Sequence, residues 1–356
     1  MGHGLNANVA VVAEAGSSVG TGHLVEALTI VSELQARGLR PVLMVPPEAP
    51  MDLVGRAGVQ VERLPALDPA VLAEVGQRLI ADGVRLVVTD LREVSDPQVM
   101  ALSKAGLRVT CIDEFGGRRL SCAAVINPSP VARRHLYTSE VRGFRVYAGP
   151  EYLALSSEYI RWHSVPRHFS SGIRLVVVSM GGVDRTGATL RIAEALRGWE
   201  SDAERHIVMG AGFQLWDEVE RLVSRSPGRW RIHRNLPCLA DLLAAADVGI
   251  SAGGNTLCEM ACVGTPALVL YEDEHEAEQG RAFEEKGFGF CLGAGVEVSG
   301  DSIRRAIGRL EDPTVRRAQS EAGKALVDGR GASRICQILE EHLSIDSSIA
   351  AGSPGQ

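Results

Sequence analysis

Short apolar runs alternate with longer amphipathic stretches through most of the chain. Residues 8–13 (NVAVVA) are nearly all apolar, which is typical of a strand buried on both faces. In the stretch His23–Arg37, apolar residues recur three or four positions apart, as on one face of a helix, and Gly38 marks its end. This repetition of strand and helix predicts a parallel sheet covered by helices on both faces.

The same alternation predicts the other elements of two α/β halves. In the first half we expect further strands at Pro41–Val45, Val59–Leu64, Leu86–Thr89, Arg108–Ile112 and Ala123–Ile126, and helices at Pro69–Asp82 and Asp96–Ala105. In the second half we expect strands at Arg174–Ser179, His206–Met209, Trp230–His233, Asp247–Ile250, Ala267–Leu270 and Phe288–Cys291. Its helices are expected at Thr186–Leu196, Leu215–Ser224, Leu239–Ala245, Thr256–Val263, Glu276–Lys286 and Ser302–Leu310.

The fold class is therefore α/β, with two Rossmann-like doubly wound domains. We expect an N-terminal domain at 1–160, a second domain at 173–330, a closing helix at 331–343 and a disordered tail at 344–356, which is rich in Ser, Gly, Ala and Pro. Ligands bind at the carboxyl ends of such sheets, so the loops that follow the strands are the candidate sites, and both sets of loops are expected to face one cleft.

Composition and charge narrow the class of protein. The chain has 356 residues, and 45% of them are hydrophobic, which is enough for two ordinary domains. A net charge of −7 shows no basic footprint, so a nucleic-acid partner is not expected. Seven scattered cysteines without a C-x-x-C pair indicate reduced thiols. The sequence contains no run of ~18 apolar residues, so no membrane-spanning segment is expected. A cytoplasmic location is therefore expected.

The first candidate loop, Gly16–His23 (GSSVGTGH), follows the first strand and opens the first helix. Its glycines permit a close approach of the backbone to a ligand, and we expect Gly20, Thr21 and Gly22 to contact the substrate. His23 at the helix start is either a catalytic group or an ordinary capping or exposed histidine, and its spacing alone does not decide between them. The loop lacks the G-x-G-x-x-G fingerprint of dinucleotide binding.

The second candidate loop, Ser251–Glu259 (SAGGNTLCE), also joins a strand to a helix. Gly253 and Gly254 leave room for an anion at the helix N-terminus, where free N–H groups and the helix dipole favour a diphosphate. Either Asn255 or Thr256 adds a side-chain donor. Glu259 lies one turn further on, where it accepts hydrogen bonds from ribose hydroxyls or is an ordinary exposed glutamate.

Two weaker candidate loops follow other strands of the second half. Gly181 and Gly182 lie in a small-residue loop that either touches the phosphates or simply turns the chain. His275 and Gln279 are four residues apart in an acidic stretch and are expected to share one helix face. No second histidine stands at ligand spacing, so we expect no metal site and no cofactor, although a carboxylate pair that binds Mg²⁺ stays open.

The order of these loops resembles a known family. Glu14 to His23, Asp113, Asn127-Pro128, Gly149–Tyr152, Ser179–Asp184 and Ser251–Glu259 together resemble the nucleotide-sugar hydrolases of the pseudaminic acid pathway and their spore-coat polysaccharide relatives, within the GT-B glycosyltransferase superfamily. The resemblance covers about residues 8–310. It implies a GT-B fold and a nucleoside-diphosphate sugar as partner.

The resemblance also implies roles for individual residues. Gly253 to Thr256 would hold the diphosphate, Glu259 the ribose, and main chain near 208–211 and 235–236 the base of the nucleotide. His23 would be the catalytic base. Three positions depart from the family pattern: Glu26 stands where Arg is usual, Glu14 where Asp is usual, and Asp273–Glu276 where Asn-Gln is usual.

Four functions remain open on the sequence. A glycosyltransferase passes the sugar to a small or glycan acceptor, which we favour slightly because of the departures. A hydrolase passes it to water, as the resemblance implies. A 2-epimerase of related fold is weaker. A non-catalytic nucleotide-sugar binding module would keep the Gly253–Glu259 loop but would not need His23.

Overall fold

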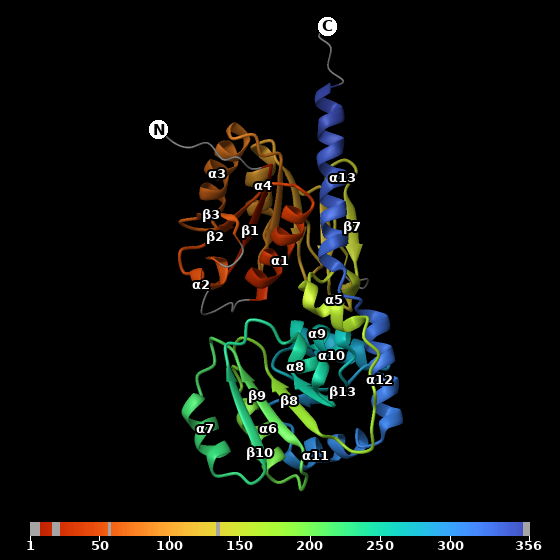
Figure 1. Ribbon diagram of the computed structural model, residues 1–356. Helices are drawn as coiled ribbons and strands as arrows, with labels where there is room; N and C mark the ends of the chain where they lie inside the picture. Colours follow the sequence, from red (N-terminus) through yellow and green to blue (C-terminus); the bar gives the residue numbers. More distant parts are fainter. Residues whose placement is uncertain (1–7, 16–21, 56–57, 133–135, 352–356) are drawn as a thin grey trace. The chain divides into compact units, whose positions relative to one another are not determined.

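The computed structural model describes residues 8–15, 22–55, 58–132 and 136–351. The chain forms two compact units (Figure 1). Unit 1 contains the chain up to Leu155 and again from Arg330, and unit 2 contains Ser156–Gly329. The chain therefore passes from one unit to the other twice.

Unit 1 is built on a parallel sheet of seven strands in the order β3-β2-β1-β4-β5-β6-β7. The strands are β1 (Val9–Ala13), β2 (Pro41–Val45), β3 (Gln60–Arg63), β4 (Leu86–Asp90), β5 (Arg108–Ile112), β6 (Ala124–Asn127) and β7 (Arg145–Ala148). The helices are α1 (Gly22–Ala36), α2 (Met51–Val54), α3 (Pro69–Ala81), α4 (Asp96–Lys104), the 3₁₀ helix η3 (Pro150–Tyr152) and α13 (Gly331–Ala351).

Alternation along β1 shows how the sheet of unit 1 is covered. Val9 and Val11 pack with apolar side chains of α1 and α13, while Ala10 and Val12 pack with those of α3 and α4. Successive residues of a strand point to opposite faces, so an uninterrupted apolar strand is the expected result of covering both faces. The predicted parallel, doubly wound sheet is confirmed.

Unit 2 is built on a parallel sheet of six strands in the order β10-β9-β8-β11-β12-β13. The strands are β8 (Leu175–Ser179), β9 (Glu204–Met209), β10 (Arg229–Arg234), β11 (Val248–Ser251), β12 (Ala267–Tyr271) and β13 (Phe290–Ala294). The helices are α5 (Ser157–His163), α6 (Ala188–Arg197), α7 (Trp216–Ser224), α8 (Ala240–Ala245), α9 (Asn255–Val263), α10 (Glu274–Glu285), α11 (Gly300–Arg309) and α12 (Pro313–Leu326).

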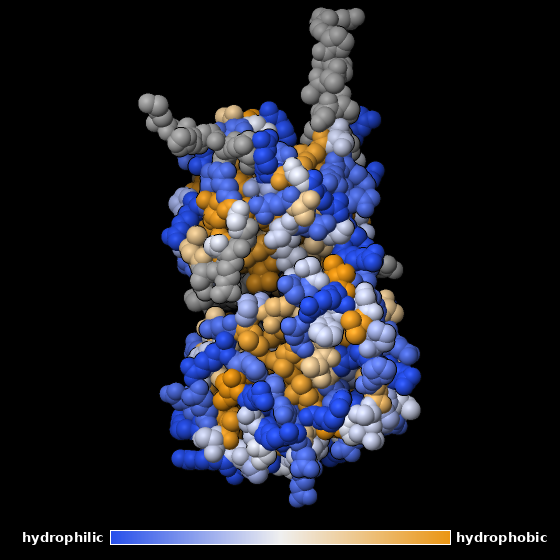
Figure 2. Space-filling model, viewed as in Figure 1, coloured by the Kyte–Doolittle hydropathy of each residue, from blue (hydrophilic) through white to orange (hydrophobic). Residues whose placement is uncertain are grey.

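The surface of unit 2 is divided between hydrophobic and hydrophilic areas. In the view of Figure 2, hydrophobic residues gather over the middle of its sheet, whereas the rim is largely hydrophilic. Across the described residues of both units, no helix is long and apolar enough to cross a membrane.

The end of the chain differs from the sequence expectation. Helix α13 continues to Ala351, past Ser344, where the sequence analysis expects a disordered tail to begin. Its first half is held in unit 1 by Ile335 and Leu339, which are completely buried against the sheet. Extending a helix costs far less than starting one, so this anchored segment supports the following turns. The rest of the predicted tail, residues 352–356, lies outside the described residues.

The junction between the units also differs from the expected join. Residues 156–163 belong to unit 2, because α5 packs on α8 and α9. Tyr159 is buried there, and Trp162 Nε1 donates a hydrogen bond of 2.6 Å to Asp241 of α8. These contacts draw the chain into unit 2 before residue 160.

Candidate functional site

The strand orders define one special position in each sheet. The chain winds outward from β1 to β3 and then, beginning with β4, in the other direction, so β1 and β4 flank the switch point of unit 1. In unit 2 the same position lies between β8 and β11. The loops that leave the carboxyl ends of two such strands diverge and open a crevice, which is the usual ligand site of this architecture.

The switch point of unit 1 holds a histidine–carboxylate pair. His23 is the second residue of α1, and Asp90 is the last residue of β4. His23 Nδ1 lies 2.7 Å from Asp90 Oδ1. The His23 side chain is 20% exposed, whereas the Asp90 side chain is only 1% exposed, so a buried carboxylate holds an imidazole that solvent can reach.

This pair changes the proton affinity of both groups. Burial by itself lowers the pKa of His23, but the Asp90 carboxylate, with Glu114 and Glu26 behind it, raises that pKa to about 9. Burial raises the pKa of Asp90, and the neighbouring His23 offsets part of that rise. Asp90 Oδ2 is buried and has no hydrogen-bond partner in the described part of the chain.

Glu26, one of the three positions that depart from the pattern of the resembling family, influences the pKa of His23 and is therefore near this pair. Its side chain is buried, and Oε1 accepts a hydrogen bond of 3.3 Å from the Ala154 backbone N–H. Burial, together with the charges of Asp90 and Glu114, holds the pKa of Glu26 well above its usual range. The substitution therefore changes the charge next to His23 and does not lie on an outer helix face.

Three other motif residues of unit 1 accept backbone hydrogen bonds within or between loops. Glu14 Oε2 accepts a hydrogen bond of 3.0 Å from the Arg92 backbone N–H, which ties the loop after β1 to the loop after β4. Asp113 Oδ2 accepts from Gly116 N at 3.2 Å, and Asn127 Oδ1 accepts from Ser129 N at 2.9 Å. Gly22 begins α1, while the predicted contact residues Gly20 and Thr21 lie outside the described residues.

In unit 2, the Gly253–Glu259 loop leaves β11 at the switch point and opens α9. Gly254 is the N-cap of α9 and supplies no side-chain cap; Leu257 N donates to Gly254 O at 2.9 Å, so the N–H groups of Asn255 and Thr256 are the ones left for another partner. Gly253 has a packing reason as well: a Cβ there would lie 2.2 Å from the Glu276 carbonyl oxygen of α10. Close packing alone therefore requires glycine at Gly253.

Glu259 is partly exposed on α9 and is hydrogen-bonded to Tyr159 of α5. Burial raises the pKa of Glu259 to about 7, and the Tyr159 hydroxyl lowers it against that trend. Asn255 and Thr256, in the first turn of α9, are also partly exposed. Tyr159 was missed by the sequence analysis, because a tyrosine in a presumed connecting segment gives no signal of its own.

The small-residue loop after β8 packs against the loop after β9. Gly181 has a φ of +87°, and Gly212 N donates to Gly182 O at 2.9 Å. A Cβ on Gly210 would lie 2.5 Å from Gly182 Cα, so the two loops meet backbone to backbone. Asn235 after β10 has a φ of +51° and donates its N–H to Met209 O. These loops form one edge at the carboxyl ends of β8, β9 and β10.

His275 and Gln279 contact each other on α10. Gln279 Nε2 donates to His275 Nε2 across 2.6 Å, and Gln279 is buried. Nearby, burial and the charge of Glu276 raise the pKa of Glu272 to about 8, while Arg185 lies 3.3 Å from it and favours its charged form. Among the described residues, no group of three His, Cys, Asp or Glu side chains is placed to hold a metal ion.

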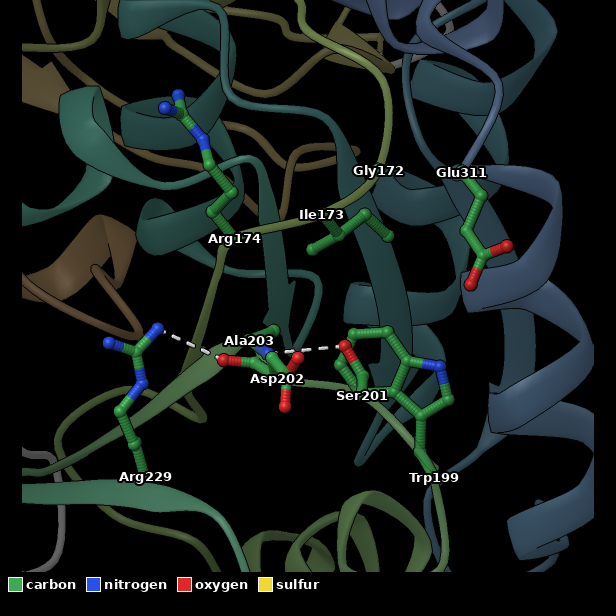
Figure 3. A pocket seen from close by; sticks show the side chains of 9 residues that line it. All are labelled: Gly172, Ile173, Arg174, Trp199, Ser201, Asp202, Ala203, Arg229 and Glu311. Atoms are coloured by element: carbon green, nitrogen blue, oxygen red, sulfur yellow. Dashed lines mark hydrogen bonds between the residues drawn. The ribbon is translucent and has the colours of Figure 1, made fainter.

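Unit 2 also has a shallow pocket at the opposite edge of its sheet, where β8, β9 and β10 begin (Figure 3). The pocket is lined by Gly172, Ile173, Arg174, Trp199, Ser201, Asp202, Ala203, Arg229 and Glu311. Two hydrogen bonds join lining residues to one another: Arg229 donates to Asp202 O at 3.0 Å, and Ala203 N donates to Ser201 Oγ at 3.2 Å. It lies at the other end of the strands from the unit 2 motif loops that follow β8 and β11.

Comparison with known proteins adds to this geometry. No family model matches the chain. The spore coat polysaccharide biosynthesis protein SpsG of Bacillus subtilis is 27% identical over 200 residues, which are 55% of this chain and 58% of that protein. The chain thus covers less than two thirds of that relative's length.

Two solved structures show the fold. Acinetobacter baumannii MurG matches with a TM-score of 0.67 at 13% identity, over 94% of this chain and 99% of that one. The S. aureus MnaA–UDP co-structure matches with a TM-score of 0.64 at 13% identity, over 95% and 97%. The chain therefore has the GT-B fold that its motifs predict. In sequence the chain is similar to the spore-coat polysaccharide protein SpsG, so the predicted resemblance to the spore-coat polysaccharide relatives is confirmed.

Proposed function

We propose that this chain is a glycosyltransferase that moves a sugar from a nucleoside-diphosphate sugar to an acceptor hydroxyl. His23 is the base in this reaction, and the Gly253–Glu259 loop holds the nucleotide. The observation that carries the proposal is the 2.7 Å contact between His23 Nδ1 and Asp90 Oδ1 at the switch point of unit 1. In the neutral imidazole, a carboxylate in that position keeps the single proton on Nδ1, which leaves the Nε2 lone pair free to accept another.

The proposed reaction has one proton transfer and one substitution at carbon. His23 Nε2 takes the proton of the acceptor hydroxyl, and that oxygen forms a bond to C1 of the sugar. The bond between C1 and the diphosphate oxygen breaks, and the diphosphate leaves with the electron pair. The free N–H groups and dipole of the α9 N-terminus favour the charge that develops on the leaving group.

The nucleotide half of the proposal rests on α9 and its neighbours. The partly exposed Asn255 and Thr256 supply donors for phosphate oxygens, and the backbone of Gly181 and Gly182 supplies further polar groups on the other side of the switch point. Glu259 accepts hydrogen bonds from ribose hydroxyls when it is ionised. The UDP bound in the MnaA co-structure makes a uridine nucleotide the first candidate.

Replacement of His23 by Ala tests the base. The expected result is a loss of at least ~100-fold in release of the nucleoside diphosphate, because general base catalysis contributes that much, with the nucleotide Kd unchanged within about twofold. Full activity in His23→Ala would contradict the assignment. If the wild-type protein released no nucleoside diphosphate from any donor, the binding-module alternative would replace the enzyme.

The hydrolase stays the second candidate, since the resemblance and the match to SpsG do not separate water from an acceptor. The two are distinguished by incubating wild-type protein with UDP-, GDP-, ADP-, CDP- and TDP-sugars in buffer alone. Rapid release without any acceptor favours the hydrolase, whereas release that begins only when acceptors are added favours the transferase. A cytoplasmic location stays a prediction.

A further inference from the structure

The pocket at the amino ends of β8, β9 and β10 is a cavity of about 360 Å³ in unit 2 (Figure 3). Segments that are far apart in the sequence meet there: Gly172–Arg174 before β8, Trp199 and Ser201–Ala203 between α6 and β9, Arg229 of β10, and Glu311 between α11 and α12. Pockets of about 300–1,000 Å³ commonly hold small molecules, so this one has room for a ligand with a single ring.

The buried Arg205 holds one wall of this pocket in place. Its guanidinium donates to the carbonyl oxygens of Trp199 at 2.8 Å, Ser201 at 3.1 Å and Ala203 at 2.8 Å. It also lies 5.2 Å from the centre of the Trp199 indole. Arg205 itself does not line the pocket, so it supports the wall from behind. A wall that is already fixed reduces the cost of ordering side chains when a ligand binds.

The lining combines apolar surface with hydrogen-bonding groups that are still available. The apolar surface comes from Ile173 and from the partly exposed indole of Trp199. No described residue forms a side-chain hydrogen bond with the indole N–H of Trp199 or with the carboxylates of Asp202 and Glu311. In the view of Figure 3, Glu311 lies on the same side of the pocket as the indole, and the two arginines lie on the other.

The charges of the lining exclude several classes of ligand. Two positive and two negative side chains are present: Arg174, Arg229, Asp202 and Glu311. Arg229 is already engaged, with Asp202 O at 3.0 Å and Glu204 Oε1 at 3.2 Å, so an anion would find little free positive charge and two carboxylates. A fully apolar ligand would take charged groups out of water at a cost. No metal-binding group of three is found among the described residues.

A neutral ring that carries hydroxyl groups satisfies these conditions. Each hydroxyl can donate one hydrogen bond to a carboxylate and accept others from N–H groups. The C–H groups of such a ring supply the apolar contact that an aromatic side chain favours. A sugar in its pyranose form has both properties.

We propose that this pocket binds one neutral pyranose unit of a glycan, with C–H groups against Trp199 and Ile173 and hydroxyls bonded to Asp202 and Glu311. The inference goes beyond the proposed function, because the pocket lies at the other end of β8 from the Gly181–Gly182 loop. The five residues of β8 span ~17 Å, so the unit bound here differs from the sugar that is transferred. The pocket would hold a longer glycan at a distance from the reacting unit.

The test measures binding of simple sugars without any nucleotide sugar. The methyl glycosides of glucose, galactose, mannose and N-acetylglucosamine are titrated at pH 7 in phosphate-free buffer. The indole N–H signal of Trp199 and the backbone N–H signal of Asp202 are followed by NMR. At least one glycoside should shift both signals with a Kd in the millimolar range, the usual strength for a ligand of this size. Saturation with UDP should leave that Kd unchanged within about twofold.

Variants of the lining show which side chains are responsible. Trp199→Leu should weaken binding about tenfold, measured at the Asp202 signal, because the aromatic contact is lost. Glu311→Ala should weaken it about three- to tenfold through loss of one hydrogen-bonding group. Glu311 is exposed, so this variant tests the pocket even if Trp199→Leu does not fold. The matched control is Glu321→Ala, at an exposed position of α12 outside the pocket, which should bind as the wild type does.

Four results would overturn the proposal. None of the glycosides shifts the two signals at up to ~50 mM, or UDP competes with the glycoside. Inorganic phosphate shifts the same signals and displaces the glycoside, which would make the pocket an anion site. Glu311→Ala binds as tightly as Glu321→Ala. If the protein released no nucleoside diphosphate from any donor, the transferase proposal would fail while this inference stood, because the titration involves neither a donor nor His23.

Discussion

The Asp90→Asn variant tests how the carboxylate controls His23. In the wild-type protein the pKa of His23 is about 9, so the neutral imidazole amounts to only ~1% at pH 7, and the rate should rise about tenfold per pH unit until near pH 9. Without the charge of Asp90 the pKa of His23 should fall toward its ordinary value of 6.5, where most of the imidazole is neutral at pH 7. The acid limb of the profile therefore moves down by about two pH units.

The plateau of the same profile should fall at the same time. An asparagine can accept from Nδ1–H through its oxygen or donate to Nδ1 through its nitrogen, so it no longer enforces one tautomer, and loss of this control costs up to roughly 10⁴-fold in the serine protease that serves as the reference case. We expect a plateau at least ~100-fold lower at pH 9 and a smaller deficit at pH 7, where more of the base is neutral.

The assay is kcat/KM for nucleoside diphosphate release between pH 6 and pH 10. Asp82→Asn, at the partly exposed C-cap of α3, is the matched control and should reproduce the wild-type profile. If Asp90→Asn kept both the position of the acid limb and the height of the plateau, the pair would have no part in the base function. Thermal unfolding at pH 8 shows whether the variant is folded.

Further predictions concern unit 2. The pKa of Glu259 is about 7, and ribose binding needs its carboxylate, so the affinity for UDP, measured by calorimetry, should rise from pH 6 to pH 8. Glu259→Gln should flatten that pH dependence and weaken binding about tenfold at pH 8. An unchanged pH profile in this variant would refute the ribose role. Gly253→Ala should destabilise unit 2 by about 1–3 kcal/mol in denaturant unfolding, because its Cβ would overlap the Glu276 carbonyl. The control is Gly308→Ala on α11, which has open space around it and should be neutral or stabilising by up to ~1 kcal/mol. Equal stability of the two alanine variants would contradict the packing account of Gly253.

The sequence predicted the fold well where strands are fully apolar. The apolar run Val9–Ala13 and the helical pattern after it predicted a buried strand in a parallel sheet, because burial on both faces leaves only apolar residues in a strand. The edge strand Arg145–Ala148 was missed, since its first two residues are exposed and its composition is mixed. Helix Ser157–His163 was also missed, because it is short and rich in polar residues that pair within the folded unit.

The candidate site was predicted in part. His23 and the Gly253–Glu259 loop could be located because they follow predicted strands, which is a local signal. Asp90 could have been found by the same rule, as it ends the strand that neighbours β1. The burial of Glu26 could not be predicted from the sequence, because Glu26 bonds to Ala154, which is 128 residues away along the chain.

The return of α13 to unit 1 has a consequence during synthesis on the ribosome. Arg37 binds Glu340 at 2.9 Å across 303 positions, and Ile335 completes a hydrophobic layer begun by α1. Unit 2 is one continuous segment, so it can finish folding while unit 1 still waits for its last helix. Contacts so distant along the chain close slowly. Nascent chains that stop before residue 330 would therefore expose an apolar sheet face, and chaperones should bind unit 1 rather than unit 2.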